Sequence, residues 1–194
     1  VSPLRQATEA QAYDLVTDSA DQIRRMISID DNPPLEQLLR TNIAPTLVNF
    51  IDPQNYHFEK LISEFSWILA NIASGDGFYV QYLVSLDVIP KALDLLQYGN
   101  VAIKENAVTL LANIAGENTE YRDQLLQSGI INLIEYVHST YVDGSSLSFP
   151  TEFAWFLSVF TRGTPYPDFS QVNFFPESYL NNNFLDDTYS EHSC

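Results

Sequence analysis

Cysteine, basic residues and long apolar runs are scarce in this sequence of 194 residues. The one cysteine, Cys194, is the last residue, so no internal disulfide can form. No apolar run approaches the roughly 18 residues of a membrane-spanning helix, and the first residues lack the basic start and apolar core of a signal peptide. The sequence also contains no Asn-x-Ser/Thr glycosylation site. These absences predict a protein of the cytoplasm and nucleus.

The shortage of lysine and arginine leaves a strongly acidic chain. It has 9 basic residues and 25 acidic ones, which gives a formal net charge of -16. Such a field repels nucleic acids and anionic membranes, and it attracts basic polypeptides. We therefore expect no nucleic-acid or membrane partner. Solubility alone is the other explanation of the charge, and the placement of the acidic residues must decide between the two.

What the sequence does contain is a repeat. The five residues LANIA occur at 69–73 and again at 111–115, 42 positions later. The match continues downstream, where Tyr79 aligns with Tyr121 and Leu83 aligns with Leu125. A fainter third copy, TEFAWFLSVFTRG, places Trp155 at the phase of Trp67 once the loop 142–150 accommodates four extra residues. Since these are the only two tryptophans, their common phase supports the third copy.

Within each copy the apolar spacing is helical. Leucines and isoleucines recur at steps of three and four, and breaks precede residue 88 and residue 130, at Asp87 and Gly129, with a further break at 97–100. Each unit therefore has a short, a medium and a long helix, and the long one carries LANIA. A period near 42 residues with two or three helices is typical of armadillo or HEAT repeats. We predict an all-α, right-handed armadillo solenoid of about three to four units.

The expected organisation places armadillo repeats over residues 1–165. A partial first unit covers about 1–40, a second 41–85, a third 86–127 and a degenerate fourth 128–165. Residues 166–194, with two prolines and no clean period, form an irregular tail or an incomplete repeat.

Polar residues recur on one face of the predicted long helices. Trp67 and Asn71 are four residues apart, and Glu64 joins them three residues earlier. The same phase of the next copy holds Asn106, Thr109 and Asn113, and the third copy holds Glu152, Trp155 and Val159. Because the apolar residues of LANIA supply the core face, this row is expected at its edge, lining the concave surface of the solenoid.

The chemistry of this row suits an extended basic peptide. An asparagine amide offers both acceptor and donors, so a ladder of them can hold a peptide backbone without reading its sequence. Tryptophans one repeat apart form slots for lysine stems, and nearby carboxylates select the charge. The alternative is that each asparagine caps or cross-links neighbouring helices and that tryptophan is ordinary core.

These residues resemble the early repeats of the importin α family, the adaptors of nuclear import, over roughly residues 5–165. The W-x-x-x-N spacing followed by IASG or IAG is the specific part of the match. The resemblance implies a groove that binds basic nuclear localisation signals, without cofactor or metal. It assigns peptide-binding roles to Trp67 and Asn71 as an intact pair, to Asn113 and to Trp155.

The resemblance also assigns a lysine site. Gly75 falls where a backbone carbonyl helps to hold the key lysine, and Glu117 falls where the family places an aspartate that pairs with the ammonium group. The departures are Thr109 in place of the middle tryptophan, Val159 in place of the third asparagine, and Val80 in place of a threonine. We therefore expect a divergent member with an altered cargo preference. Importin β is expected as a partner only if the full-length protein has the basic N-terminal segment that this chain lacks.

Two other interpretations remain open, and a third, an enzyme, is not expected. A general armadillo scaffold for a partner without a localisation signal would explain the missing tryptophan and asparagine. A degenerate fragment with weak cargo binding would explain them too. An enzyme is not expected, because His57, His138 and His192 stand at unrelated phases, with His57 and His138 in expected loops and no catalytic or metal-binding pattern beside them.

Overall fold

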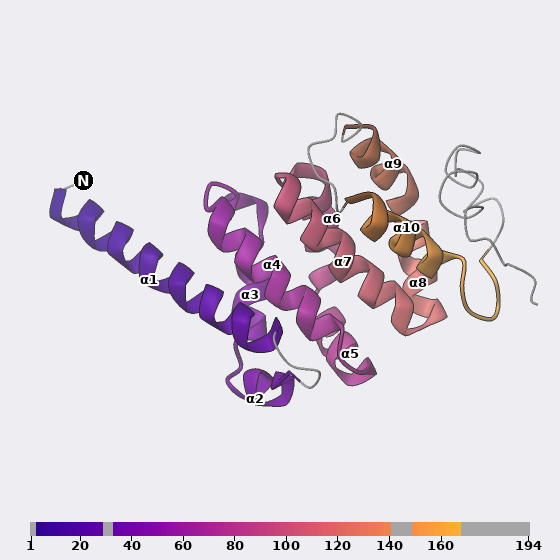
Figure 1. Cartoon of the computed structure of the whole chain (residues 1–194), viewed down its shortest axis with the longest axis horizontal. Coiled ribbons are helices and arrows are strands. Elements are labelled where there is room, and N and C mark those ends of the chain that lie inside the picture. The colour runs from indigo at the N-terminus through magenta and orange to yellow at the C-terminus, as the bar shows by residue number, and fades with distance from the viewer. Residues whose placement is uncertain (1–2, 29–32, 141–148, 168–194) are drawn as a thin grey trace, which may run out of the picture.

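The computed structural model describes residues 3–28, 33–140 and 149–167. Within these ranges every regular element is helical (Figure 1). The chain begins with a long helix, α1 (Pro3–Ser28), followed by two short helices, α2 (Leu35–Arg40) and α3 (Ala44–Phe50). A 3-10 turn, η1 (Pro53–Asn55), leads into the first long repeat helix, α4 (Glu59–Ala73).

Two triplets of helices follow, and they confirm the predicted short, medium and long order. The first triplet comprises α5 (Gly77–Ser85), α6 (Val88–Tyr98) and α7 (Val101–Glu117), with 9, 11 and 17 residues. The second comprises α8 (Thr119–Gln127), α9 (Ile130–Thr140) and α10 (Phe149–Phe160). The proposed unit boundaries at 41, 86 and 128 fall after α2, α5 and α8, so they lie between helices, and those at 86 and 128 fall within the two triplets.

The break before each medium helix has a local cause. Asn42, Asp87 and Gly129 have φ angles of 57°, 62° and 78°, and they precede α3, α6 and α9. This left-handed conformation ends one helix and redirects the chain into the next, and Gly, Asn and Asp tolerate it best. The predicted breaks at Asp87 and Gly129 are therefore confirmed, and Asn42 performs the same turn upstream.

The N-termini of the helices are capped by the same kind of residue in each repeat. Asp76 caps α5 by accepting a hydrogen bond from the Phe78 N–H at 3.1 Å, and Asn118 caps α8 by accepting one from the Tyr121 N–H at 2.9 Å. Asn100 caps α7 through the Ile103 N–H. Each cap satisfies a backbone donor that the first helical turn leaves unpaired.

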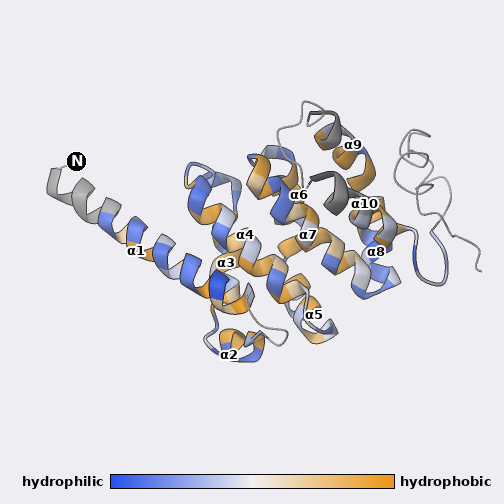
Figure 2. Cartoon of the chain, in the orientation of Figure 1, coloured by the Kyte–Doolittle hydropathy of each residue, from blue (hydrophilic) through white to orange (hydrophobic). Residues whose placement is uncertain are grey.

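The long helices stack side by side in the order α1, α4, α7, α10 (Figure 1). Their apolar residues form one continuous core, in which the leucine and isoleucine of both LANIA copies are fully buried. In Figure 2 the coloured part of α1 is mostly hydrophilic, whereas α4 and α7 carry extensive hydrophobic stretches. This is the arrangement of a solenoid, in which each layer buries its apolar face against the next.

Two sequence-based expectations were wrong. The expected loop 142–150 ends earlier, because α10 begins at Phe149. His138 was placed in a loop, but it lies inside α9, because the helix continues to Thr140. His57 does lie in a turn, before α4, whereas His192 lies outside the described residues.

In the described part of the chain, no helix is long and apolar enough to cross a membrane.

The last repeat contains a buried cation that the sequence analysis missed. Arg122 of α8 is only 1% exposed, and its guanidinium donates to the carbonyl oxygens of Arg162 at 2.6 Å and Pro165 at 2.9 Å. It also pairs with the Asp123 carboxylate at 2.7 Å. The segment that follows α10 is thereby held against α8. A charge this deeply buried is tolerated only because the guanidinium is paired with two carbonyl oxygens and a carboxylate.

Candidate functional site

The long helices place the expected polar residues on neighbouring elements. Trp67 and Asn71 of α4 and Asn106 and Asn113 of α7 are all half-buried, as expected for residues at the edge of the core. Trp155 of α10 is 40% exposed. Glu152 also belongs to α10, but its side chain lies outside those described.

The asparagine of the first LANIA copy bonds within its own helix. The Asn71 amide donates to the Trp67 carbonyl oxygen, four residues earlier, at 2.9 Å. This bond uses one of the two amide hydrogens, and the amide oxygen has no partner among the described residues. Asn71 therefore retains both a donor and an acceptor for a ligand.

The asparagines of α7 cross to α4 instead. Asn113 donates to the Ala70 carbonyl oxygen at 2.9 Å. Asn106 donates to the Ser63 carbonyl oxygen at 2.9 Å and to the Ser66 hydroxyl at 3.1 Å. Both residues thus cross-link neighbouring helices, which is the structural role that the sequence left open as the alternative. Asn113 still keeps its amide oxygen and one hydrogen.

The Trp67 end of the site contains an arginine of the same chain. Arg24 of α1 donates from Nε to the Glu64 carboxylate at 2.7 Å, and its guanidinium carbon lies 5.8 Å from the centroid of the Trp67 ring. A second carboxylate, Asp21, accepts from the same guanidinium. The hydrogen bond from Arg24 lowers the pKa of Asp21 below its ordinary value, and the same bond raises the pKa of Arg24.

Sequence reasoning did not find Arg24. The available signal was its place in the one adjacent pair of basic residues of the chain, Arg24-Arg25, in an otherwise acidic surrounding. The contact itself joins residues 40 positions apart, so no local pattern specifies it.

The expected lysine site lies at the turn between α4 and α5. Glu117, the last residue of α7, places its carboxylate directly over this turn, since a Cβ on Gly77 would come within 2.1 Å of the Glu117 Oε1 atom. The Gly75 carbonyl oxygen accepts no backbone hydrogen bond from the described residues. Val80, the substituted threonine position, is 1% exposed and belongs to the core. The turn therefore carries the Gly75 carbonyl oxygen, and the Glu117 carboxylate lies two residues further along, over Gly77.

The two residues that replace the expected tryptophan and asparagine, Thr109 and Val159, have different environments. Thr109 donates its hydroxyl to the Glu105 carbonyl oxygen at 3.1 Å within α7, and it offers no ring. Val159 is 7% exposed, and its methyl group lies 3.6 Å from where a Cβ on Gly116 would be. The third asparagine position has thus become part of the apolar contact between α10 and α7.

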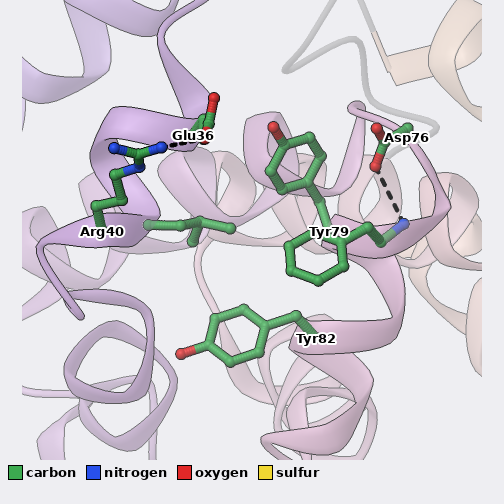
Figure 3. A pocket seen from close by; sticks show the side chains of 7 residues that line it. Glu36, Arg40, Asp76, Tyr79 and Tyr82 are labelled. Atoms are coloured by element: carbon green, nitrogen blue, oxygen red, sulfur yellow. Dashed lines mark hydrogen bonds and ion pairs between the residues drawn. The ribbon is translucent and has the colours of Figure 1, made fainter.

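A cavity of about 460 Å³ lies beside this turn, between α2 and α5. It is lined by seven residues, namely Glu36, Leu39, Arg40, Asp76, Phe78, Tyr79 and Tyr82. Figure 3 shows Tyr79 and Tyr82 on one side of it and the ion pair of Arg40 with Glu36 on the other. The Tyr79 ring packs against the backbone of Gly75, where a Cβ would come within 2.4 Å of it. Sequence reasoning did not predict this cavity.

Among the described residues, no group of histidine, cysteine, aspartate and glutamate side chains is arranged to hold a metal ion.

Comparisons with known proteins agree with this architecture. The family model for the Armadillo/beta-catenin-like repeat matches residues 79–116, which span most of α5, α6 and α7. "Importin subunit alpha-1b" of Oryza sativa subsp. japonica is 31% identical over 168 residues, which is 86% of this chain and 30% of that protein. "Probable importin subunit alpha-A" of Dictyostelium discoideum is 32% identical, over 84% of this chain and 31% of that protein. The chain thus spans about a third or less of the length of these curated relatives.

Designed proteins are among the solved structures with the same fold. A designed armadillo repeat protein in complex with the peptide (KR)4 superposes with a TM-score of 0.62 and 22% identity, covering 89% of this chain and 64% of that one. Computationally designed armadillo repeat proteins for modular peptide recognition give a TM-score of 0.63 and 20% identity, covering 76% of this chain and 59% of the other. At this identity the likeness concerns the fold alone.

Proposed function

Since this chain is an armadillo-repeat protein and a divergent, partial relative of the importin α subunits, we propose that it binds lysine- and arginine-rich nuclear localisation signals. The signal would lie as an extended peptide in an acidic groove along α4, α7 and α10. This is an adaptor role, without catalysis. The partners proposed are basic cargo proteins, and importin β for a full-length protein that has a basic N-terminal segment. The proposed locations are cytoplasm and nucleus.

The observation that carries this proposal is the presence of two hydrogen-bond acceptors near the turn between α4 and α5. The Glu117 carboxylate lies over Gly77, and the Gly75 carbonyl two residues earlier has no backbone partner among the described residues. An ammonium group has three donors and no acceptor, so a carboxylate and a free carbonyl are the partners it requires. A lysine side chain is therefore the ligand group that best fits this turn.

The asparagines support the backbone part of the proposal. Asn71 and Asn113 each use one amide hydrogen inside the protein and keep the second hydrogen and the oxygen. An extended peptide presents alternating N–H and C=O groups, which such amides can pair with. The internal bonds also hold the amides in one orientation, so that less side-chain entropy is lost on binding.

The altered positions support a second candidate, a general scaffold for a partner without a localisation signal. Thr109 offers no aromatic wall, and Val159 is buried against α7, so the middle and third positions lack the expected groups. A cation–π contact contributes about 0.5–2 kcal/mol, so losing such walls weakens lysine binding by about one or two powers of ten. Selectivity for basic over neutral peptides separates the two candidates.

The test is a fluorescence anisotropy titration of a labelled lysine-rich signal peptide at two salt concentrations. A second peptide has its central lysine replaced by alanine. The protein variants are Asn71→Ala, which removes an amide bonded only within its own helix, and Glu117→Gln, which removes the exposed carboxylate. Glu120→Gln is the matched control, because it removes the same charge from an exposed carboxylate at the start of α8.

We expect micromolar or tighter binding that weakens with Asn71→Ala, with Glu117→Gln and with the altered peptide, while Glu120→Gln binds like the unmodified protein. Equal binding of basic and neutral peptides would favour the general scaffold. Binding that disappears with salt and ignores every substitution would reflect the net charge alone, since exposed charges are screened beyond about 8–10 Å at physiological salt. That result would refute the proposed site.

A further inference from the structure

We propose that Glu64, Trp67 and Asp21 form a guanidinium-binding subsite, and that Arg24 of the same chain occupies it in competition with an arginine of a bound peptide. The inference rests on the proposed peptide-binding function and adds to it a preference for arginine and a built-in competitor.

Three side chains of the subsite interact with the guanidinium. The Glu64 carboxylate accepts from Arg24 Nε, the Asp21 carboxylate accepts from a terminal nitrogen, and the Trp67 ring lies 5.8 Å from the guanidinium carbon. Glu64 is the most shielded of these charged groups, with 15% of its side chain exposed. A planar, delocalised cation with donors along its edge satisfies this arrangement, and a compact ammonium cannot satisfy all of it.

The occupant comes from a different layer of the solenoid. Arg24 lies on α1, whereas Glu64 and Trp67 lie on α4, three residues apart on one face. Its side chain keeps 31% exposure, so the guanidinium is reached by solvent and can be displaced without opening the core. Because α1 holds Arg24 at a fixed position, its local concentration at the subsite far exceeds that of a free peptide.

The competition follows from this arrangement. Two of the three walls, Glu64 and Trp67, are residues that the sequence assigns to peptide binding. A peptide arginine that enters must displace Arg24, so the observed affinity equals the intrinsic affinity multiplied by the fraction of molecules whose subsite is empty. An empty subsite increases the affinity of a lysine-only peptide less, because the planar guanidinium of arginine, with several donors along its edge, fits the subsite better than an ammonium group does.

The neighbouring residue provides a matched control. Arg25 carries the same charge, pairs with Asp21 at 2.8 Å and is 67% exposed, but it contacts neither Glu64 nor Trp67 in the structure. Arg24→Gln and Arg25→Gln therefore change the net charge equally, and both keep a good helix former in α1. Only the first one empties the subsite.

The experiment titrates labelled (KR)4 and an octalysine peptide with the unmodified protein and with both variants. Removing an arginine held by an ion pair and a cation–π contact is expected to tighten (KR)4 binding by about tenfold relative to Arg25→Gln. Octalysine binding should tighten less. The double variant Arg24→Gln/Glu64→Gln should lose the gain, because the principal carboxylate is gone.

Arg24→Lys is the control for a change in binding that is caused by a loss of the contact between α1 and α4. It keeps the charge and the aliphatic stem but not the fork, and we expect it to bind (KR)4 more tightly than the unmodified protein does. Equal affinity of Arg24→Gln and Arg25→Gln, or weaker binding by Arg24→Gln and Arg24→Lys, would overturn the inference while leaving peptide binding intact. Failure of every variant to bind either peptide would overturn the proposed function, and the inference with it.

Discussion

The helices α4 and α7 carry the same five residues, LANIA, yet the two copies differ in their polar contacts. In α4 the Asn71 amide bonds to its own helix, whereas in α7 the Asn113 amide crosses to the Ala70 carbonyl of α4. The apolar residues behave alike, because Leu69 and Leu111 are both fully buried. An identical sequence thus specifies an identical core, while the neighbouring helix determines the role of the asparagine.

The neighbours of the two helices explain this difference. α7 packs against α4, whose Ala70 carbonyl lies within reach of Asn113. α4 packs against α1, which offers a charged contact through Arg24 and Glu64. The two copies are therefore equivalent in sequence and unequal in surroundings, because each inner layer of the solenoid contacts different neighbours.

The largest expected effect tests the equivalence of the cores. Leu69→Ala and Leu111→Ala should each destabilise the protein by about 3 kcal/mol, because both remove a fully buried leucine and leave a cavity. Urea denaturation followed by circular dichroism measures the two losses. Leu15→Ala, at a residue that is 61% exposed on α1, should change little. Losses that differ by more than about 2 kcal/mol, close to the spread for such substitutions, would contradict the equivalence.

A second prediction extends the comparison to the last layer. Val80 of α5 and Arg122 of α8 occupy the same repeat phase, and both are 1% exposed. Arg122→Met keeps most of the volume but removes the hydrogen bonds to the Arg162 and Pro165 carbonyls, so we expect a loss of about 2–3 kcal/mol. Arg162→Met, at an exposed position, serves as the control. A neutral or stabilising Arg122→Met would show that the buried charge is dispensable, as it is in some proteins.

A third prediction separates the two asparagines. Asn113→Ala should destabilise the protein by about 1 kcal/mol, because it removes a bond between helices. Both substitutions gain the better helix propensity of alanine, but Asn71→Ala loses only a bond within one helix, so it should change stability by only a few tenths of a kcal/mol. Thermal unfolding by calorimetry measures both. An equal loss at the two sites would show that neighbouring helices do not set the asparagine role.

The smallest effect concerns the ion pair between Arg24 and Asp21 on α1, the helix that packs against α4. The hydrogen bond from Arg24 lowers the pKa of Asp21 below its ordinary value of 3.8, so this group stabilises the fold above that value and ceases to do so as the pH falls through the lowered pKa. Arg24→Gln should raise the pKa of Asp21 toward the ordinary value, with Arg25 still paired. NMR titration of the Asp21 carboxyl carbon measures the shift. Arg40→Gln, whose partner is Glu36, should leave it unchanged.

Much of the fold could be predicted from local pattern. The breaks at Asp87 and Gly129 follow from the left-handed turns that those residues permit, and the order of short, medium and long helices follows from apolar spacing. His138 was misplaced because apolar spacing alone does not locate the last turn of a helix. The half-buried position of Trp67 and Asn71 at the core edge was also predictable, since residues four apart share one face.

The sequence by itself therefore determined the repeat, which is a direct match of residues 42 positions apart. It also determined the helix phases and the residues that form the core, because these depend on neighbours within a few positions. Only the tertiary structure decided that Asn113 bonds to α4, that Arg24 lies against Trp67, and that Arg122 holds the segment after α10. The two arginine contacts and the Asn113 bond join residues at least 40 positions apart in the chain. Such partners are selected by the stacking of layers, and a local pattern carries no information about them.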